Sequence, residues 1–249
     1  MATYLVPDTI EKCKIGNTEF EIKKKIIPND LRATRNVCVW IKKGDLMKPC
    51  RKMSTGRPLG VCIHNTNMIS TPSDTNPAEQ YCRATYNGHM SGAVVHFYVY
   101  RDQIWQLLDI NEQGWHAGDS GKISKNLTKD GTINGNADTI AIEIIGDDKE
   151  SEKYGAILAA YLLRKIGMYT YNGLYYHKYF TGKNCPEYIL PHWEDFVYAV
   201  RTYFDNKDYQ EGDSIIIRGT VIRTTPSKLV HIKTKTSSYL IRLDDIERG

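Results

Sequence analysis

Between residues 58 and 204 the sequence alternates short apolar runs with longer segments of helical period. The runs PLGVCIHNT (residues 58–66) and TIAIEII (residues 139–145) are short and rich in β-branched residues, as is typical of buried strands. Segment 150–167 instead repeats its apolar residues every three or four positions, which predicts an amphipathic helix that ends at Gly167. Strands that alternate with helices predict an α/β fold, with a mixed central β-sheet flanked by helices.

Further element boundaries are marked by helix-start and turn residues. Asn76 followed by Pro77 is typical of a helix N-cap and first helical position, and Gly88 is expected to end that helix. The segments VVHFYVY and IWQLL, joined by a turn at residues 101–103, are strand candidates. A last helix is expected to begin near Pro191, because apolar residues recur at helical spacing in the segment that follows.

The two ends of the chain differ from this core in composition. Residues 1–50 contain a strand-like run, TEFEIKKKIIP, and an apolar-basic segment, VCVWIKKGDL, and we expect them to form an extension packed on the main domain. After Phe204 a polar linker precedes several short strand-like segments. The sequence therefore predicts a main domain over residues 1–206 and a small C-terminal β-rich module over residues 210–249, which is short for independent folding.

Charge and hydropathy argue against several classes of protein. The 249-residue chain is 41% hydrophobic and 25% charged, with a formal net charge of +4, which is ordinary for a folded soluble protein. The positive excess is small and interspersed, so we expect no nucleic-acid partner. No stretch approaches the length of a membrane-spanning helix, and the first residues lack the pattern of a secretory leader. We therefore expect synthesis in the cytoplasm, no membrane insertion, and free thiols for most of the six cysteines.

Three residues with good zinc-binding side chains stand at the ends of apolar runs or in a loop. His64 comes near the end of PLGVCIHNT, His177 ends GLYYH, and Cys185 follows in HKYFTGKNCP. Imidazole and thiolate bind zinc well, and three protein ligands with an open fourth position are typical of a catalytic site. Spacing alone leaves the alternative open, because a strand-end histidine is more often a hydrogen-bonded polar residue, and a cysteine beside proline is usually a small buried side chain.

Three motifs follow one another in the chain, which are VCIHNT, TIAIEI and HKYFTGKNCP. Together they resemble the motifs of the zinc amidase family of phage lysins and peptidoglycan recognition proteins. The third is the most specific, because it is similar to a closing motif in which a ligand histidine and a ligand cysteine flank a loop with a lysine two residues before the cysteine. The segment WHAGD (residues 115–119) also resembles a loop along the family's substrate groove. The resemblance covers residues 57–205 and implies Zn²⁺ bound by His64, His177 and Cys185.

The resemblance implies N-acetylmuramoyl-L-alanine amidase activity, which is hydrolysis of the amide between N-acetylmuramic acid and the L-alanine of peptidoglycan. It assigns Glu143 as general base and Lys183 as the positive charge beside the tetrahedral oxyanion. Glu143 alternates with isoleucines, so it is expected to point to the opposite face of its strand. Trp115 and His116 are expected to contact the substrate. Val95 stands where some of these amidases carry a catalytic tyrosine, which increases the reliance on Glu143.

Other interpretations stay open at this stage. A non-catalytic peptidoglycan-recognition module is the main alternative, although Cys185 together with both histidines argues against it. A papain-like peptidase is disfavoured because Cys62 and Cys82 lie within a predicted strand and a predicted helix, not at a helix N-terminus. The leading hypothesis is an endolysin-like amidase that reaches the bacterial cell wall through a separate export or holin-type route. Its C-terminal module would bind the wall or form a homo-oligomer.

Overall fold

The computed structural model describes residues 4–28, 41–42, 45–46, 52–66, 76–90, 93–118, 133–168, 170–205, 220–224, 229–233 and 238–242. The chain divides into two compact units, Met1–Asp208 and Tyr209–Gly249. Among the described residues, every helix is too short or too polar to cross a membrane.

The first unit is built on a mixed sheet with seven strands in the described part of the chain. They are β1 (Thr9–Ile15), β2 (Thr18–Lys24), β5 (Gly60–Thr66), β6 (Phe97–Tyr100), β7 (Gln103–Gln106), β8 (Thr139–Ile145) and β9 (Leu174–Tyr176). Their order across the sheet is β1-β2-β7-β6-β8-β5-β9. Strand β5 pairs in parallel with both β8 and β9, and β6 is also parallel to β8, whereas β6–β7 and β1–β2 are antiparallel pairs. The centre of the sheet is therefore parallel.

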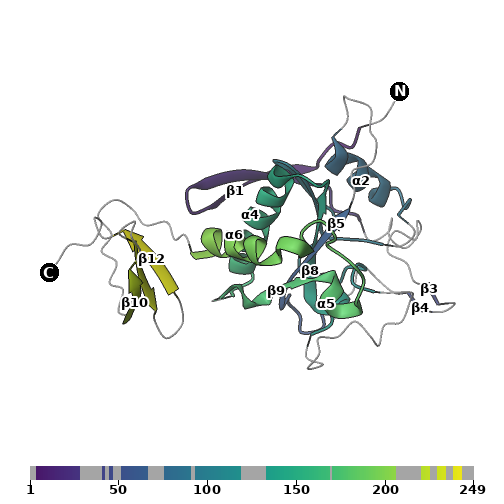
Figure 1. Cartoon of the computed structure of the whole chain (residues 1–249). Coiled ribbons are helices and arrows are strands. Elements are labelled where there is room, and N and C mark those ends of the chain that lie inside the picture. The colour runs from purple at the N-terminus through teal and green to yellow at the C-terminus, as the bar shows by residue number, and fades with distance from the viewer. Residues whose placement is uncertain are drawn as a thin grey trace. The chain divides into compact units, whose positions relative to one another are not determined.

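Helices pack on both faces of this sheet. Helix α4 (Lys149–Lys165) packs against α6 (Trp193–Asp205) and also contacts β5, β6 and β8 (Figure 1). Helix α2 (Pro77–Tyr86) contacts β6 and β7, and its buried residues belong to a different hydrophobic cluster from those of α4. Two short helices adjoin strands in the chain. Helix α3 (Gly135–Asp138) directly precedes β8, and helix α5 (His177–Thr181) directly follows β9. The expected α/β fold, with helices flanking a mixed sheet, is confirmed.

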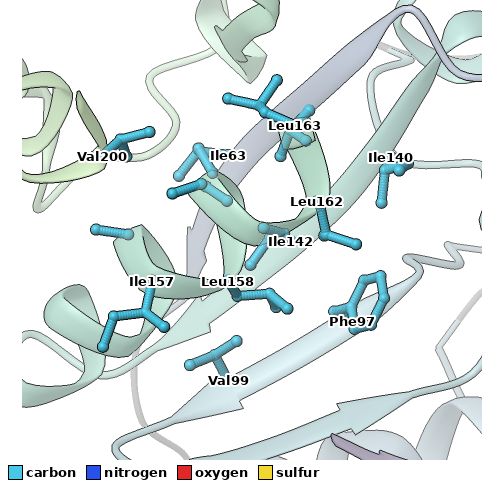
Figure 2. Packing of buried hydrophobic residues seen from close by; sticks show 14 of the residues in the cluster. Ile63, Phe97, Val99, Ile140, Ile142, Ile157, Leu158, Leu162, Leu163 and Val200 are labelled. Atoms are coloured by element: carbon cyan, nitrogen blue, oxygen red, sulfur yellow. The ribbon is translucent and has the colours of Figure 1, made fainter. Parts of the chain in front are cut away.

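Side-chain alternation along β8 decides which residues enter the core under α4. Ile140, Ile142 and Ile144 are buried in one cluster with Leu158 of α4. Figure 2 shows side chains of α4 packed over those of the central strands. Ala141 lies between these isoleucines and belongs to the cluster on the α2 side. Successive residues of β8 therefore serve two separate layers of packing, as the two-residue period of a strand requires.

Capping residues fix the helix ends. Asn76 caps α2, because its side chain accepts hydrogen bonds from the backbone N–H groups of Ala78 and Glu79 at 2.9 and 3.2 Å. Asp148 caps α4 in the same way. Gly167 follows α4 with a φ of 79°, a left-handed conformation that glycine adopts without steric cost. The predicted start of α2 and the predicted end of α4 are confirmed.

The N-terminal extension joins the main sheet as a hairpin. Strands β1 and β2 pair antiparallel, and β2 then pairs in parallel with β7. Phe20 and Ile22 of β2 are buried in the cluster under α4. Tyr161 of α4 stacks edge-on against Phe20, with ring centroids 5.2 Å apart. Strands β1 and β2 of the extension therefore pack on the main sheet, and the first of them was not anticipated from the sequence.

The second unit contains a three-stranded antiparallel sheet within its described residues, formed by β10 (Thr220–Thr224), β11 (Leu229–Lys233) and β12 (Ser238–Arg242). This agrees with the β-rich composition of the region. In the first unit, the two-residue strands β3 (Ile41–Lys42) and β4 (Asp45–Leu46) pair with each other. They are the described part of the segment VCVWIKKGDL, and the rest of that segment lies outside the described residues.

Candidate active site

The parallel strands β5 and β8 carry His64 and Glu143 to neighbouring positions. The two residues are direct partners in the strand register, near the C-terminal ends of their strands. The residues that flank them, such as Ile63 and Ile142, are buried in the cluster under α4. Since side chains alternate along a strand, His64 and Glu143 occupy the opposite face of the sheet, the one that carries α2.

His177 and Cys185 approach His64 from the segment that follows β9. His177 is the first residue of α5, and its ring centroid lies 4.7 Å from that of His64. The Cys185 sulfur lies 3.7 Å from Nδ1 of His64. One potential ligand atom from each of the three residues falls within 4.8 Å of the others. The three side chains predicted to bind zinc are therefore brought together.

The loop after α5 is shaped by local backbone contacts. Gly182 ends α5 in the left-handed conformation, with a φ of 82°. The backbone N–H of Lys178 then donates to the carbonyl of Cys185 at 2.9 Å, so the loop returns to the start of the helix. The spacing HKYFTGKNC therefore corresponds to one short helix and one return loop. This arrangement carries the cysteine back beside the histidine that begins the helix.

Burial controls the charge state of these groups. His64, His177 and Cys185 are 3%, 3% and 7% exposed. Burial lowers the pKa of His64 well below its usual range, and the neighbouring His177 and His116 rings lower it further. Burial also raises the pKa of the Cys185 thiol to about 12. Two imidazoles and a thiol at a buried site are a suitable donor set for Zn²⁺, because the cation stabilises the thiolate that burial disfavours.

A second group of possible ligands shares His64. Atoms of Cys62, His64 and His116 also fall within 4.8 Å of one another. The Cys62 sulfur and Nδ1 of His116 both face Nε2 of His64, at 3.3 and 3.0 Å. Cys62 is fully buried and does not line the pocket described next, whereas the trio of His64, His177 and Cys185 lines it. The trio is therefore the better candidate for a catalytic metal, which needs an open ligand position.

The trio opens onto a pocket of about 340 Å³. Glu143 and Lys183 line the same pocket, together with residues from β5, α2, the segment before β6 and the loop after α5. The other lining residues are Asn65, Thr66, Tyr81, Met90, Ala93, Val95, Tyr98, His116, Asn184 and Glu187. His64, His177 and Cys185 therefore share one concave site with a carboxylate and an exposed lysine.

Glu143 has the electrostatic setting of a proton carrier. Burial raises the pKa of its carboxyl to about 8, and the positive charge of Lys183 opposes that rise. The same burial raises the pKa of Tyr98, which is the register partner of Glu143 on β6. A carboxyl that titrates close to neutral pH can both accept and return a proton during a reaction.

The two residues predicted to contact substrate are placed differently. His116 lines the pocket and is 8% exposed. Trp115 is absent from the pocket lining, and its backbone exchanges two hydrogen bonds with Val94, at 2.8 and 2.9 Å. This pair is an isolated bridge, and β6 begins only at Phe97, later than the apolar run suggests. A contact between Trp115 and substrate stays a prediction.

Asn136 of α3 is a residue that the sequence did not single out. Its side-chain oxygen accepts hydrogen bonds from the backbone N–H groups of His116 and Ala117, both at 2.7 Å. An asparagine in a Gly- and Asn-rich loop carries no signal that distinguishes this role from an ordinary helix start. Tyr81 and Tyr98 were also missed as pocket residues, because both read as packed aromatic residues of a helix and a strand.

Comparison with known proteins agrees with this geometry. The sequence model of the N-acetylmuramoyl-L-alanine amidase family matches residues 54–188, which is more than half of the chain. The chain belongs to this amidase family. The matched range holds the candidate ligands His64, His177 and Cys185 together with Glu143 and Lys183, so the whole candidate site lies in the part that the family shares. The resemblance proposed from the three motifs is confirmed.

Two curated amidases of Bacillus subtilis strain 168 are similar in sequence. N-acetylmuramoyl-L-alanine amidase CwlH is 31% identical over 146 residues, which cover 57% of this chain and 53% of CwlH. N-acetylmuramoyl-L-alanine amidase XlyA is 28% identical over 198 residues, which cover 76% of this chain and 60% of XlyA. The chain thus spans between half and two thirds of the length of these relatives.

Two solved structures share the fold. The catalytic domain of XlyA superposes with a TM-score of 0.53 at 26% identity, and the match covers 72% of this chain and 98% of that domain. PlyL superposes with a TM-score of 0.54 at 20% identity, over 73% of this chain and 98% of PlyL. The first likeness includes the sequence, whereas the second concerns the fold alone.

Proposed function

We propose that this chain is an endolysin-like amidase that hydrolyses the amide between N-acetylmuramic acid and L-alanine in peptidoglycan. The observation that carries the proposal is the convergence of His64, His177 and Cys185 on a pocket that also holds Glu143. Membership of the amidase family supports the reaction, and the names of CwlH and XlyA support the substrate.

The proposed cofactor is Zn²⁺, held by His64, His177 and Cys185. The donor set supports this choice, because two imidazoles and one thiolate leave a fourth position open. When bound, the ion supplies a Lewis acid that polarises a carbonyl group and lowers the pKa of water. The remaining steps fall to side chains of this protein.

Glu143 is the proposed proton carrier. In this mechanism its carboxylate accepts a proton from the attacking water and returns it to the leaving amine of L-alanine. In the protein without zinc, burial raises the pKa of this carboxyl to about 8, which supports a role in proton transfer near neutral pH. Lys183 is proposed to stabilise the negative charge that develops on the carbonyl oxygen. Val95, a pocket residue, has no group that could take over either task.

The test compares wild type with Cys185→Ser on purified peptidoglycan, with zinc content measured on both proteins. We expect the variant to lose zinc and to stop releasing new amino termini of the stem peptide, while wild type releases them without new reducing sugar ends. Cys13→Ser is the matched control, because Cys13 is a buried thiol in the cluster under α4. It should keep both zinc and activity.

Two results would replace this proposal. Zinc bound by wild type without cleavage of any wall type would favour a peptidoglycan-recognition module that does not cut its ligand. Cleavage by a protein that binds no zinc would show that the ligand assignment is wrong. In that case a metal-independent mechanism would have to be sought among the same pocket residues.

The second unit, Tyr209–Gly249, is proposed to bind the cell wall or to mediate self-association. The proposed route to the wall is separate export or a holin-type release. Deleting the residues after Asn206 tests the second unit. We expect weaker binding to intact walls or a smaller assembly, measured by sedimentation with walls and by light scattering. Unchanged binding and assembly would reduce this unit to a structural appendage.

A further inference from the structure

The two ring nitrogens of His64 face different groups. Nδ1 faces the sulfur of Cys185 at 3.7 Å, on the side of the metal trio. Nε2 faces Nδ1 of His116 at 3.0 Å, on the other side of the ring. The rings of His64 and His116 meet edge-on, with centroids 5.0 Å apart and planes at 89°. The ring of His64 therefore has Cys185 on one side and His116 on the other.

The proposed position of zinc, among His64, His177 and Cys185, determines the tautomer that His64 must adopt. A neutral imidazole carries one proton, so a ring that binds metal through Nδ1 must carry its proton on Nε2. This buried N–H then needs an acceptor, since an unsatisfied donor costs free energy. Nδ1 of His116 at 3.0 Å and the sulfur of Cys62 at 3.3 Å are both within reach. An imidazole nitrogen is a strong acceptor, whereas a thiol sulfur is a weak one.

We propose that His116 is the positioning residue that accepts the Nε2 proton of His64 and thereby directs Nδ1 of His64 to the metal. The inference rests on the proposed zinc site. It gives His116 a role through another side chain, in addition to any contact with substrate. Metal-binding histidines commonly depend on such a partner, which fixes both the tautomer and the orientation of the ring.

The segment that carries His116 is held in place from two sides. Asn136 accepts hydrogen bonds from the backbone N–H groups of His116 and Ala117, both at 2.7 Å. One residue earlier, the backbone of Trp115 pairs with Val94. A side chain at Gly114 would place its Cβ 2.8 Å from the His116 ring, so only glycine fits beside it. These contacts hold the segment that carries the His116 ring in place without a metal ion.

The ring of His116 is itself largely buried. Its exposed fraction is only 8%, so most of the ring contacts protein. Its Nε2 has no hydrogen-bond partner among the described residues. A neutral ring with its proton on Nε2 leaves Nδ1 as the acceptor. This is the tautomer that the proposed contact with His64 needs.

Zinc affinity of the full chain, measured by competition with a chromogenic chelator, tests the proposal. His116→Ala should weaken zinc binding by about 10–100-fold, the usual range for loss of a residue that supports a metal ligand. His116→Asn should recover most of the affinity, because the asparagine oxygen can take the place of Nδ1 as acceptor. Cys62→Ala is the matched control, since the Cys62 sulfur also faces Nε2 of His64, and this variant should keep the zinc affinity of wild type. Equal affinity of wild type and His116→Ala, or no recovery in His116→Asn, would overturn the proposal.

A second measurement needs no variant. Nitrogen-15 NMR of the zinc-loaded wild type should show the His64 proton on Nε2 and an unprotonated Nδ1 in His116. A proton on Nδ1 of His64 would overturn the inference. Cys185→Ser in the same chelator assay separates the two levels of the argument. If Cys185→Ser keeps zinc, the proposed metal site fails. If Cys185→Ser loses zinc while His116→Ala keeps full zinc affinity, only the proposed role of His116 fails.

Discussion

Strands β5 and β8 place alternate residues on two faces of the sheet, and the two faces differ in what their side chains contact. On one face, Ile63 and Ile142 pack in the apolar cluster under α4. On the other face, their neighbours His64 and Glu143 line a pocket. One residue along the strand therefore separates a side chain that stabilises the fold from one that is suited to chemistry.

A carboxylate on each face makes the contrast quantitative. Glu143 faces the pocket, and burial raises its pKa to about 8 because only the charge of Lys183 opposes that rise. Burial also raises the pKa of Glu11 on β1, but hydrogen bonds and charges from Lys24 and Lys165 outweigh it and lower the pKa to about 2. The comparison teaches that nearby lysines stabilise the charged form of Glu11 beside α4, whereas the carboxyl of Glu143 in the pocket can be either protonated or charged near neutral pH.

The largest expected effect comes from Glu143→Gln. The amide has nearly the same shape but cannot carry a proton, so turnover of peptidoglycan should fall by about 10²–10⁴-fold. Zinc content should stay at the wild-type level, because Glu143 is not one of the proposed ligands. In the zinc-free protein the variant should be at least as stable as wild type at pH 7. A carboxyl with a raised pKa loses its contribution to stability as the pH rises from its unfolded pKa towards about 8.

The neighbour Ile142 supplies the control on the other face of the same strand. Ile142→Val should leave turnover unchanged and cost about 0.5–1.5 kcal/mol of unfolding free energy, measured by urea denaturation. If Glu143→Gln cleaves walls as wild type does, Glu143 has no part in the mechanism. The two faces would then no longer divide stability from chemistry at this position.

The next effect concerns the apolar face. Leu158 of α4 is fully buried under the sheet. Leu158→Ala should lower the unfolding free energy by about 2–5 kcal/mol, because it removes buried carbon atoms and leaves a cavity. Zinc affinity and turnover per folded molecule should change little, since the residue lies on the face without the pocket. A large loss of turnover in the fully folded variant would show that the two faces are coupled through β8.

Much of the fold could be predicted because its signals are local. The period of the segment at residues 150–167 and the Asn76–Pro77 pair gave α4 and the start of α2, and TIAIEII gave β8 at its observed bounds. Strand β1 was missed because the alternation of polar and apolar residues in TIEKCKI is short, running only from Lys12 to Ile15, and its pairing with β2 cannot be read from the segment itself. Pairing between distant segments is not encoded in either segment alone.

The candidate site was predictable to a different depth. The residues His64, His177 and Cys185 could be named because their motifs resemble those of a family, and the structure brings their side chains together. The support around them could not be named. Asn136 lies 20 residues from the backbone N–H of His116 that it binds, and nothing in an isolated asparagine indicates which loop it will hold. Such contacts follow from the folded arrangement of β7, α3 and β8.

The smallest expected effect tests the compensated carboxylate. Glu11 accepts hydrogen bonds from Tyr161 and Lys165 of α4 at 3.1 and 2.9 Å and pairs with Lys24 of β2. Glu11→Gln should lower the unfolding free energy by about 1 kcal/mol at pH 7, a modest value because these groups are partly exposed and screened by water. Since the folded pKa of Glu11 is lowered, its contribution is fully present above the unfolded value of 4.5 and is lost as the pH falls towards about 2. The stability curves of wild type and variant, measured by denaturation across this range, should therefore converge at low pH. Curves that stay parallel would mean that the lysines do not stabilise the charged form, and the contrast with Glu143 would then rest on burial alone.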